Sequence, residues 1–598
     1  MIVWGCCTQV LFLLSCDGAK SAVRTPEKDS DTDTGVEPPV VSPDPACGTH
    51  RGDESIFGDH PELIPNLESS LMGDAPEPRH IMLSWQSEPA TSITVTWQTA
   101  DTSESSITTS TQLQLSLHSD LSDMLVINGE EGNYGPKIGS AHYLPYSDQY
   151  QTIHVAEACG LETDTKYFYR VGGTDLVGQE SWSDIYHFRT APSPSIALED
   201  QSYRFVVLGD SRSDPDTWGD VINAAALEDP AFIVHVGDFV SYGLIQSYWD
   251  EWFDEAEGVL PYHPFLAVHG NHEGNALNYY AQFALPENEQ WYTLDFASLR
   301  LVVLNDTTSG VFGKGNSSIW TQETYLGHAM SESDALWKFA THHRPVYSAG
   351  NHGGSSINLD SFAPKYDTFW ASLVFSGHDH NYERTAPIFD DAKVDNPLEG
   401  TTYVVTGGAG APLRAVGSDW WTAHSESIYH YVLVQIEGRQ LSMWAKDLEG
   451  NIFDSMTIDA TNVDIDSCEE GRSCNPIVID TFPFTDSRNT VHAYSYDIDA
   501  YSCAPETNES GAEYYYSVNI PSKGTLSATL NDTSGGSVDI DIHLLDGISG
   551  DTCIVRDNVS FEQVVAAGDY YLVADTWVNS SDHALDGQYE ILVEFSEP

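Results

Sequence analysis

The stretch RFVVLGDSRSDPD, residues 204–216, joins an apolar run to a polar turn and then to the start of a helix. Its first half is typical of a buried strand, which ends at Gly209. Asp214 is a favourable N-cap and Pro215 suits the first helical position, so we expect a helix to begin here. A strand that is followed at once by a helix is the repeating unit of an α/β layer structure.

The same alternation continues to about residue 460. Helical or looped segments separate three further apolar strands, which are AFIVHV (231–236), PFLAV (264–268) and LRLVVL (299–304). We therefore expect a central α/β sandwich over residues 201–462.

Short alternating strands separated by turns flank this region on both sides. Residues 76–192 include SITVTWQT and KYFYRVGG, and residues 466–598 include AEYYYSVNI and GDYYLVADTW. Both patterns predict a β-sandwich, so the fold class is multidomain, α/β and all-β. The segment around Tyr167 resembles the tyrosine corner of fibronectin type III domains. The C-terminal region resembles the pre-peptidase C-terminal domains of secreted bacterial enzymes.

Aspartates alternate with apolar residues in VDIDIHL, residues 538–544 of the C-terminal region. Acidic clusters here could bind calcium, whose protein ligands are oxygens. Such alternation is more often the solvent face of a strand, so we expect Asp539 and Asp541 to be exposed.

The N-terminal residues 1–16 combine a short apolar stretch with Cys16, and residues 17–75 form an acidic linker that contains prolines. The apolar part is too short to span a bilayer stably. It resembles a bacterial lipoprotein signal in which Cys16 is lipidated after cleavage, although the basic residues of such signals are absent. The alternatives are an ordinary secretion signal or a misassigned start. We expect an exported bacterial protein that is periplasmic, lipid-anchored at the outer surface or extracellular.

The cysteine count agrees with export. Nine cysteines less Cys6, Cys7 and Cys16 leave six, an even number, as disulfides in an oxidising compartment require. The sequence alone leaves the connectivity open. The plausible pairs are Cys468 with Cys474, Cys503 with Cys553, and Cys47 with Cys159.

The chain is strongly acidic, with 25 lysines and arginines against 90 aspartates and glutamates and a formal net charge of −65. This charge excludes nucleic-acid binding through a basic surface. It also repels a phosphate ester at long range, so a site for such a substrate needs strong positive charge nearby.

Polar residues of metal-binding types follow five of the apolar strands. In an open α/β sheet the carboxyl ends of the strands converge on one crevice, so these residues should meet. Their oxygen and nitrogen donors, without cysteine, suit iron, zinc or manganese. Two ions that share Asp238 would use the whole set. The candidates are Asp210, Asp238, Asn271, His343, His378 and His380.

Each motif has an ordinary explanation when it stands alone. Gly-Asp after a strand is a turn in most proteins, His343 beside His342 is compatible with a core histidine, and GHDH (377–380) is compatible with a surface turn. Gly-Asn-His-Glu is more specific, because Gly270 lets the chain turn tightly. The joint occurrence of all five motifs in order, each behind a strand, favours a metal site.

The order GD, GD, GNHE, HRP, GHDH behind a fibronectin-like domain resembles the purple acid phosphatases, which are calcineurin-like metallophosphoesterases with two metal ions. The resemblance implies that Asp210, Asp238 and His380 bind the first metal. It implies a second set of Asp238, Asn271, His343 and His378. It also implies that His272, and His352 in SAGNHGG, face the phosphoryl group.

Two departures from the family pattern affect the first metal. The tyrosine that binds ferric iron in purple acid phosphatases stands three positions after the bridging aspartate, where this chain has Ser241. Tyr242 comes one place later and can serve as a ligand only if a bulge reorients it. Where many metallophosphoesterases have a histidine, this chain has Arg212, which we expect to contact the substrate phosphoryl; a surface salt bridge is the alternative. The metal's identity, the purple colour and an acid pH optimum therefore stay open.

The function that these residues indicate is the hydrolysis of phosphate monoesters by a metal-bound hydroxide, with His272 as general acid and His352 sharing that role or binding phosphate. A phosphodiesterase acting on nucleotides or phospholipids is the alternative on the same core. An extracellular binding or adhesion protein with a degenerate site is the alternative of another class.

Overall fold

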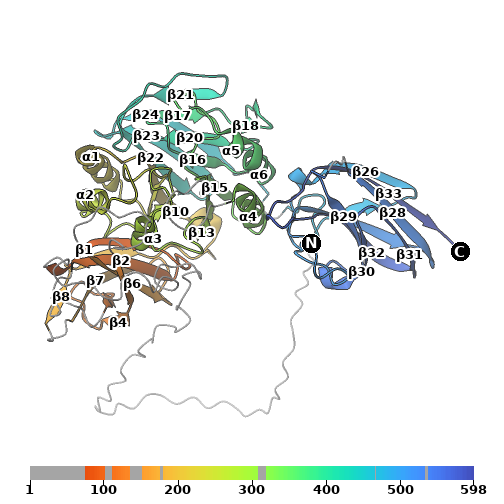
Figure 1. Ribbon diagram of the computed structural model, residues 1–598, viewed down its shortest axis with the longest axis horizontal. Coiled ribbons are helices and arrows are strands. Elements are labelled where there is room, and N and C mark those ends of the chain that lie inside the picture. Colours follow the sequence, from red (N-terminus) through yellow and green to blue (C-terminus); the bar gives the residue numbers. More distant parts are fainter. Residues whose placement is uncertain are drawn as a thin grey trace, which may run out of the picture. The chain divides into compact units, whose positions relative to one another are not determined.

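The computed structural model describes residues 75–100, 111–134, 151–174, 179–194, 196–307, 318–464, 467–532 and 536–598 (Figure 1). The expected signal and lipidated Cys16 lie outside the described residues, as does Cys47. Within the described ranges, no helix is long and apolar enough to cross a lipid bilayer.

The N-terminal region is a β-sandwich of two sheets. Its first sheet has the strand order β1-β2-β6-β5, and its second has the order β4-β3-β7-β8 with β9 also paired to β7. The strands are β1 (Ala75–Ser84), β2 (Ser92–Ala100), β3 (Gln112–Ser116), β4 (Leu125–Asn128), β5 (Glu130–Tyr134), β6 (Gln151–Cys159), β7 (Lys166–Thr174), β8 (Glu180–Trp182) and β9 (Tyr186–Arg189).

The tyrosine corner expected in this sandwich is present. The Tyr167 hydroxyl accepts a hydrogen bond of 2.9 Å from the backbone N–H of Glu162, five residues upstream. The Tyr167 ring is buried and stacks on Phe188. The bond therefore fixes the loop before β7 to the core.

The central region is a sandwich of two mixed sheets. The first has the order β12-β11-β10-β22-β23-β24 and the second the order β13-β14-β15-β16-β20-β17-β21. Strands β10, β11 and β12 are parallel, and so are β14, β15, β16 and β20. The strands of the first sheet are β10 (Ser202–Leu208), β11 (Ile233–His235), β12 (Phe265–Ala267), β22 (His430–Glu437), β23 (Gln440–Asp447) and β24 (Ile452–Asp459).

The second sheet contacts the first through aromatic residues such as Phe205 on β10 and Phe339 on β15, whose rings lie 6.0 Å apart. Its strands, with the small hairpin β18 and β19, are β13 (Tyr292–Phe296), β14 (Leu299–Val303), β15 (Trp337–Thr341), β16 (Leu373–Ser376), β17 (Tyr382–Thr385), β18 (Ile388–Phe389), β19 (Ala392–Lys393), β20 (Thr402–Thr406) and β21 (Thr422–Glu426).

Helices cover the outer faces of the two central sheets: α1 packs on β22 of the first, and α4 packs on β14 of the second (Figure 1). The expected helix start is confirmed, because the Asp214 side chain accepts from the Thr217 N–H and Pro215 opens α1. Val221, Ile222 and Ala225 are buried, as the spacing predicts. The helices are η2 (Leu198–Asp200), α1 (Pro215–Ala226), α2 (Gln246–Ala256), α3 (Leu277–Gln282), α4 (Ile319–Ser331), α5 (Ser356–Ser361) and α6 (Ala363–Thr368).

The C-terminal region is a second β-sandwich, with sheets in the order β25-β27-β32-β29-β30 and β26-β33-β28-β31. Its elements are β25 (Ile477–Ile479), β26 (Phe484–Asn489), η3 (Thr490–His492), β27 (Glu513–Ile520), β28 (Gly524–Asp532), β29 (Ile540–Leu545), η4 (Gly550–Thr552), β30 (Cys553–Asp557), β31 (Ser560–Val565), β32 (Gly568–Thr576) and β33 (Gln588–Ser596).

The cysteines of the described residues form disulfides. The pairs Cys468–Cys474 and Cys503–Cys553 are confirmed. Cys159 is disulfide-bonded as well.

One expectation for the C-terminal sandwich is wrong. Asp541 was expected on a solvent face, but its side chain is fully buried, because both faces of β29 are covered. Asp539, just before this strand, is partly exposed.

The tyrosine corner gives a local test. We expect Tyr167→Phe to speed hydrogen exchange at the Glu162 amide about 2- to 10-fold, because a hydrogen bond of this kind contributes about 0.5–1.5 kcal/mol. Amide exchange read by mass spectrometry measures this, with Tyr186→Phe in the same sandwich as control. Equal protection of Glu162 in both variants would contradict the role given to the Tyr167 hydroxyl.

Candidate metal centre

Five strand ends of the central sandwich carry the candidate ligands. Asp210 follows β10, Asp238 follows β11, Asn271 follows β12, His343 follows β15, and the GHDH turn follows β16. Asp210, Asp238 and His378 have positive φ of 58°, 57° and 70°, so the chain turns sharply at each of these positions. Side chains far apart in the sequence thus meet at the carboxyl ends of the parallel strands.

The candidates for the second metal lie together. The Nε2 atom of His343 is 3.3 Å from Oδ1 of Asp238 and 3.3 Å from Nδ1 of His378. One ligand atom from each of these three residues lies within 4.8 Å of the others. Asn271 Oδ1 is buried without a hydrogen-bond partner, as an oxygen reserved for an ion would be.

The two neighbouring histidines of the HRP motif differ in role. The ring of His343 donates from Nδ1 to the Val236 carbonyl at 2.9 Å, which directs Nε2 towards Asp238. His342 points away from Asp238, with its Nδ1 atom 2.7 Å from the Arg344 carbonyl and its ring near Phe362. The structure therefore brings His343, and not His342, to the other candidates.

The candidates for the first metal also converge. Oδ1 of Asp210 is buried without a hydrogen-bond partner and lies 3.6 Å from Nε2 of His380. The other oxygen of Asp210 accepts from the His378 N–H at 2.8 Å. His380 donates from Nδ1 to the Pro412 carbonyl at 2.9 Å, so its Nε2 lone pair faces the centre.

Arg212 lies among these first-metal candidates. Its Nε atom is 3.4 Å from Oδ2 of Asp238, and its Nη2 donates to Nε2 of His380 at 3.2 Å. The Arg212 side chain is only 13% exposed. Its guanidinium thus contacts two of the three expected ligands, and it must move before an ion can bind both of them.

Tyr242 is not brought to the centre. Its side chain is 65% exposed, and the hydroxyl of neighbouring Ser241 bonds to Ser213 instead of to any ligand candidate. We therefore leave Tyr242 out of the ligand set.

Two histidines lie at the mouth of the centre. His272 donates from Nδ1 to the Ser241 carbonyl at 2.8 Å, with its Nε2 atom 3.7 Å from Oδ2 of Asp238. The exposed ring of His352 lies 4.2 Å from that of His378, centroid to centroid. Both rings are partly open to solvent, where a substrate would enter.

Two further residues near the centre, Glu273 and Arg414, were not predicted from the sequence. The buried carboxylate of Glu273 accepts from the N–H groups of Asp238, Phe239 and Gly270 at 2.8–3.0 Å, so it holds the Asp238 turn. Arg414 hydrogen-bonds the ring of His352, and its N–H donates to the His380 carbonyl at 2.9 Å. Glu273 is the last residue of the GNHE motif, so the motif could have pointed to it, whereas no motif marks Arg414.

The pKa values reflect the crowding of charges. Burial raises the pKa of Asp210 well above its ordinary value. Burial alone would also raise that of Asp238, but the ring of His343 outweighs it, and the pKa of Asp238 falls. Burial opposes a charge on His343, yet the carboxylate of Asp238 raises its pKa to about 10. The ligand candidates for the second metal therefore suit a bound cation. Among the candidates for the first metal, the guanidinium of Arg212 is already the neighbouring cation.

Family models match two regions of the chain. Residues 203–382 match the calcineurin-like phosphoesterase model, and residues 78–190 match the N-terminal domain of purple acid phosphatases. The chain thus joins a purple acid phosphatase N-terminal domain to a calcineurin-like phosphoesterase domain. The β-sandwich, the α/β sandwich and the order of the motifs expected from the sequence agree with this assignment.

Two curated relatives and one solved structure are similar to this chain. "Probable inactive purple acid phosphatase 27" of Arabidopsis thaliana is 25% identical over 55% of this chain and 61% of its own length. "Nucleotide pyrophosphatase/phosphodiesterase" of Hordeum vulgare is 21% identical over 50% of this chain and 94% of its own length. The structure of purple acid phosphatase PPD1 from yellow lupin (Lupinus luteus) seeds has a TM-score of 0.56 at 19% identity, over 66% of this chain and 77% of that one, which shows the fold. The chain thus spans about three fifths of the length of the first Arabidopsis relative.

The hydrogen bonds of Glu273 generate a prediction. In Glu273→Gln the side-chain NH₂ would face backbone N–H groups, so the Asp238 turn would loosen. We expect metal affinity at this centre to fall about 10- to 100-fold, as when a group that orients a ligand is lost. Competition with a chelator measures the affinity, and the exposed Glu437→Gln on β22 is the matched control. Equal affinity in both variants would contradict the positioning role of Glu273.

Proposed function

We propose that this protein hydrolyses phosphate esters with two metal ions that share Asp238. One observation carries the proposal: Asp238 lies between the two groups of candidates, with Oδ1 3.3 Å from Nε2 of His343 and Oδ2 3.4 Å from Nε of Arg212. A carboxylate placed between two sets of donors is suited to bridge a pair of ions.

The ligand sets follow from these contacts. We assign Asp210, Asp238 and His380 to the first ion, and Asp238, Asn271, His343 and His378 to the second. Iron, zinc and manganese all suit such oxygen and nitrogen donors. When bound, a pair of such ions activates water as the nucleophile and stabilises the charge on the phosphoryl oxygens.

The proton for the leaving oxygen would come from His272. Its Nδ1–H is held by the Ser241 carbonyl, so the Nε2 atom is aimed at the centre, where it can carry and deliver a proton. The exposed ring of His352 would share this role or bind phosphate. Burial and the nearby guanidinium of Arg414 lower the pKa of His352, so a positive charge on its ring is disfavoured.

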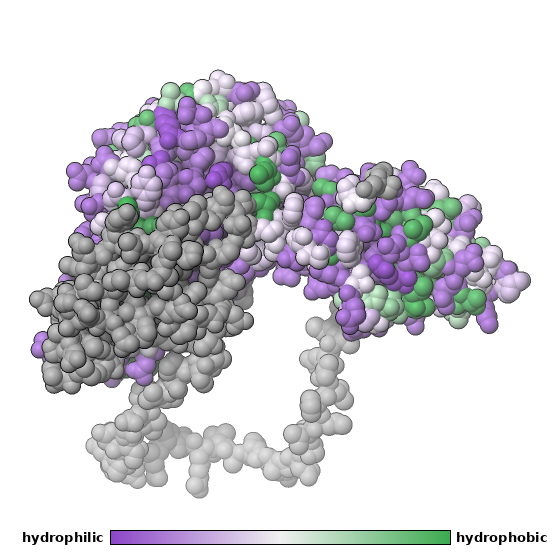
Figure 2. Space-filling model, in the orientation of Figure 1, coloured by the Kyte–Doolittle hydropathy of each residue, from purple (hydrophilic) through white to green (hydrophobic). Residues whose placement is uncertain are grey.

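Two arginines would bind the phosphoryl oxygens. Arg212 and Arg414 both contact ring nitrogens of site histidines, and a planar guanidinium matches the geometry of phosphate oxygens. Arg212 would turn from Asp238 and His380 towards the substrate once an ion occupies the first position. Such local cations would offset the repulsion from a formal net charge of −65. Hydrophilic residues, charged and uncharged, cover much of the visible face of the central sandwich in Figure 2.

The ester class has two candidates. Monoesters are our first choice, and the name of the barley relative, which this chain matches over 94% of that protein's length, favours a phosphodiesterase as the second. The ligand candidates are present, so an adhesion protein with a degenerate site ranks third, after the two hydrolase candidates. Substrates in either case are small phosphate esters.

An exported location fits the disulfides, which form in oxidising compartments. We propose that the protein reaches the periplasm or the outside of a bacterial cell, with lipidated Cys16 as its anchor. The proposed domains are residues 76–192, 201–462 and 466–598.

Metal content and hydrolysis test the proposal together. After reconstitution with iron, zinc or manganese, we expect the wild type to hold two more ions per chain than Asp238→Asn, because both ions need the shared carboxylate. Elemental analysis measures the difference, and chromogenic monoesters and diesters measure activity. We expect no purple band with iron, since the first ion lacks its tyrosine.

A difference below one ion per chain, or equal hydrolysis by the two proteins, would refute the proposal. A difference of one ion would contradict the two-ion form and leave Arg212 in the place of the first metal.

Arg212 itself gives a further prediction. We expect Arg212→Ala to lower kcat/KM about 10- to 100-fold at unchanged metal content, because a charge-assisted hydrogen bond contributes about 1.5–3 kcal/mol. Steady-state kinetics with metal analysis measure this. Arg439→Ala, remote from the ligand candidates, is the control. If Arg212→Ala keeps full kcat/KM, Arg212 does not bind the phosphoryl group.

A further inference from the structure

A second group of buried acidic side chains lies in the C-terminal sandwich, outside the centre described above. Strands β27, β32 and β29 are neighbours, and their register sets Glu513 opposite Asp575 and Asp575 opposite Asp541. All three side chains are fully buried. Like charges directly opposite on neighbouring strands destabilise a sheet, so this row needs a counter-charge.

The segment before β27 adds a fourth carboxylate. Glu509 is fully buried, and neither of its carboxylate oxygens has a hydrogen-bond partner. Arg556 on β30 contacts both Asp541 and Glu509, the latter at 3.5 Å. Within the described part of the chain, Arg556 is the one cationic side chain that contacts these four carboxylates. One guanidinium cannot balance four ionised carboxylates, so these buried groups must be neutralised either by protons or by a further cation.

His543 lies among these carboxylates with both ring nitrogens buried and without hydrogen-bond partners. Its ring stacks on Tyr501 at 3.5 Å, and the Tyr501 hydroxyl donates to Oδ2 of Asp575 at 2.6 Å. Asp575 keeps its other oxygen, Oδ1, without a partner. One ligand atom from each of Glu509, His543 and Asp575 lies within 4.8 Å of the others.

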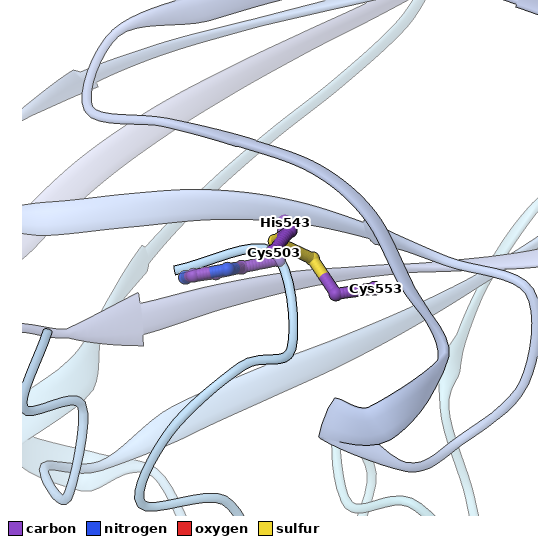
Figure 3. A group of neighbouring side chains, drawn as sticks. All are labelled: Cys503, His543 and Cys553. Atoms are coloured by element: carbon purple, nitrogen blue, oxygen red, sulfur yellow. A yellow bond between two sulfur atoms is a disulfide. The ribbon is translucent and has the colours of Figure 1, made fainter. Parts of the chain in front are cut away.

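The two cysteines beside His543 do not serve as metal ligands, because they form a disulfide. Figure 3 shows the Cys503–Cys553 bond next to the imidazole, and sulfurs joined to each other cannot act as thiolate ligands. The available donors are therefore oxygens and one nitrogen.

We propose that Glu509, His543 and Asp575 bind one divalent transition-metal ion of the zinc class. Two carboxylates with one imidazole suit such an ion, whereas calcium takes oxygen ligands. The dication offsets the buried negative charge and satisfies the polar atoms that have no partner. Because Glu509 comes from the segment before β27 and the other two ligands come from β29 and β32, the ion fastens this segment to the sheet.

The experiment uses the full chain carrying Asp238→Asn, so that ions of the central site do not obscure the count. This protein is loaded with Zn²⁺, Co²⁺ or Ca²⁺, freed of excess metal, and submitted to elemental analysis and visible spectroscopy. We expect one Zn²⁺ or Co²⁺ per chain, with Co²⁺ absorption bands of imidazole and carboxylate ligation. Adding His543→Gln or Glu509→Gln should lower the affinity at least tenfold. His492→Gln, at an exposed histidine of the same domain, should leave it unchanged.

Three results would overturn the proposal. These are less than about a tenth of an ion per chain in the Asp238→Asn protein, binding of Ca²⁺ in place of Zn²⁺ and Co²⁺, or equal affinity in the His543→Gln and His492→Gln proteins. The Co²⁺ spectrum needs no change in the C-terminal domain, so the absence of such bands overturns the proposal even if the variants of this domain fail to fold. Hydrolysis by His543→Gln with Asp238 intact should match the wild type, which separates this site from the proposed activity.

Discussion

The central site depends on a backbone turn that would be strained without its hydrogen bonds. Asp238 has a φ of 57° and follows Gly237 at 94°, a conformation that most residues avoid. The buried carboxylate of Glu273 holds this turn through the N–H groups of Asp238 and Phe239, and it ties the turn to Gly270. A Cβ on Gly270 would come within 2.2 Å of the Asp238 nitrogen, so the two turns can pack only with glycine there. Held in this turn, Asp238 contacts His343 through Oδ1 and Arg212 through Oδ2.

The main architecture could be predicted from the sequence, because the local sequence patterns agree with the observed burial. The apolar run 205–208 became β10, and Asp214 with Pro215 opened α1. The ligand candidates could be collected from strand ends, because parallel strands bring their carboxyl ends to one edge. The choice between His342 and His343 needed the structure, since adjacent residues at a strand end point to different sides and each has a plausible partner.

Other features depend on distant contacts that a local pattern cannot reveal. The alternation around Asp541 suggested solvent, but every residue of β29 is buried and Asp541 contacts Arg556 on β30. Arg212 was expected to face the substrate, and it contacts Asp238 and His380, which lie 26 and 168 residues further along the chain. The exposed Tyr242 depends on the path of the loop after β11, which its sequence does not dictate.

Both clusters pose the same electrostatic problem inside an acidic protein. Carboxylates are buried beside histidines, with one or two arginines as the nearby cations. Burial of such charges is unfavourable unless a cation accompanies them. We propose that metal ions meet that need at the strand ends of the central sandwich, where they would also bring positive charge to a surface that otherwise repels phosphate.

The most direct test of the shared carboxylate is anomalous X-ray diffraction from crystals of the full chain grown with zinc or manganese. The account predicts two anomalous peaks about 3.5–4 Å apart, one on each side of Asp238, with His343 and His378 at one peak and His380 at the other. A map without a peak beside Asp238, or with a single peak that does not touch His343, would contradict it.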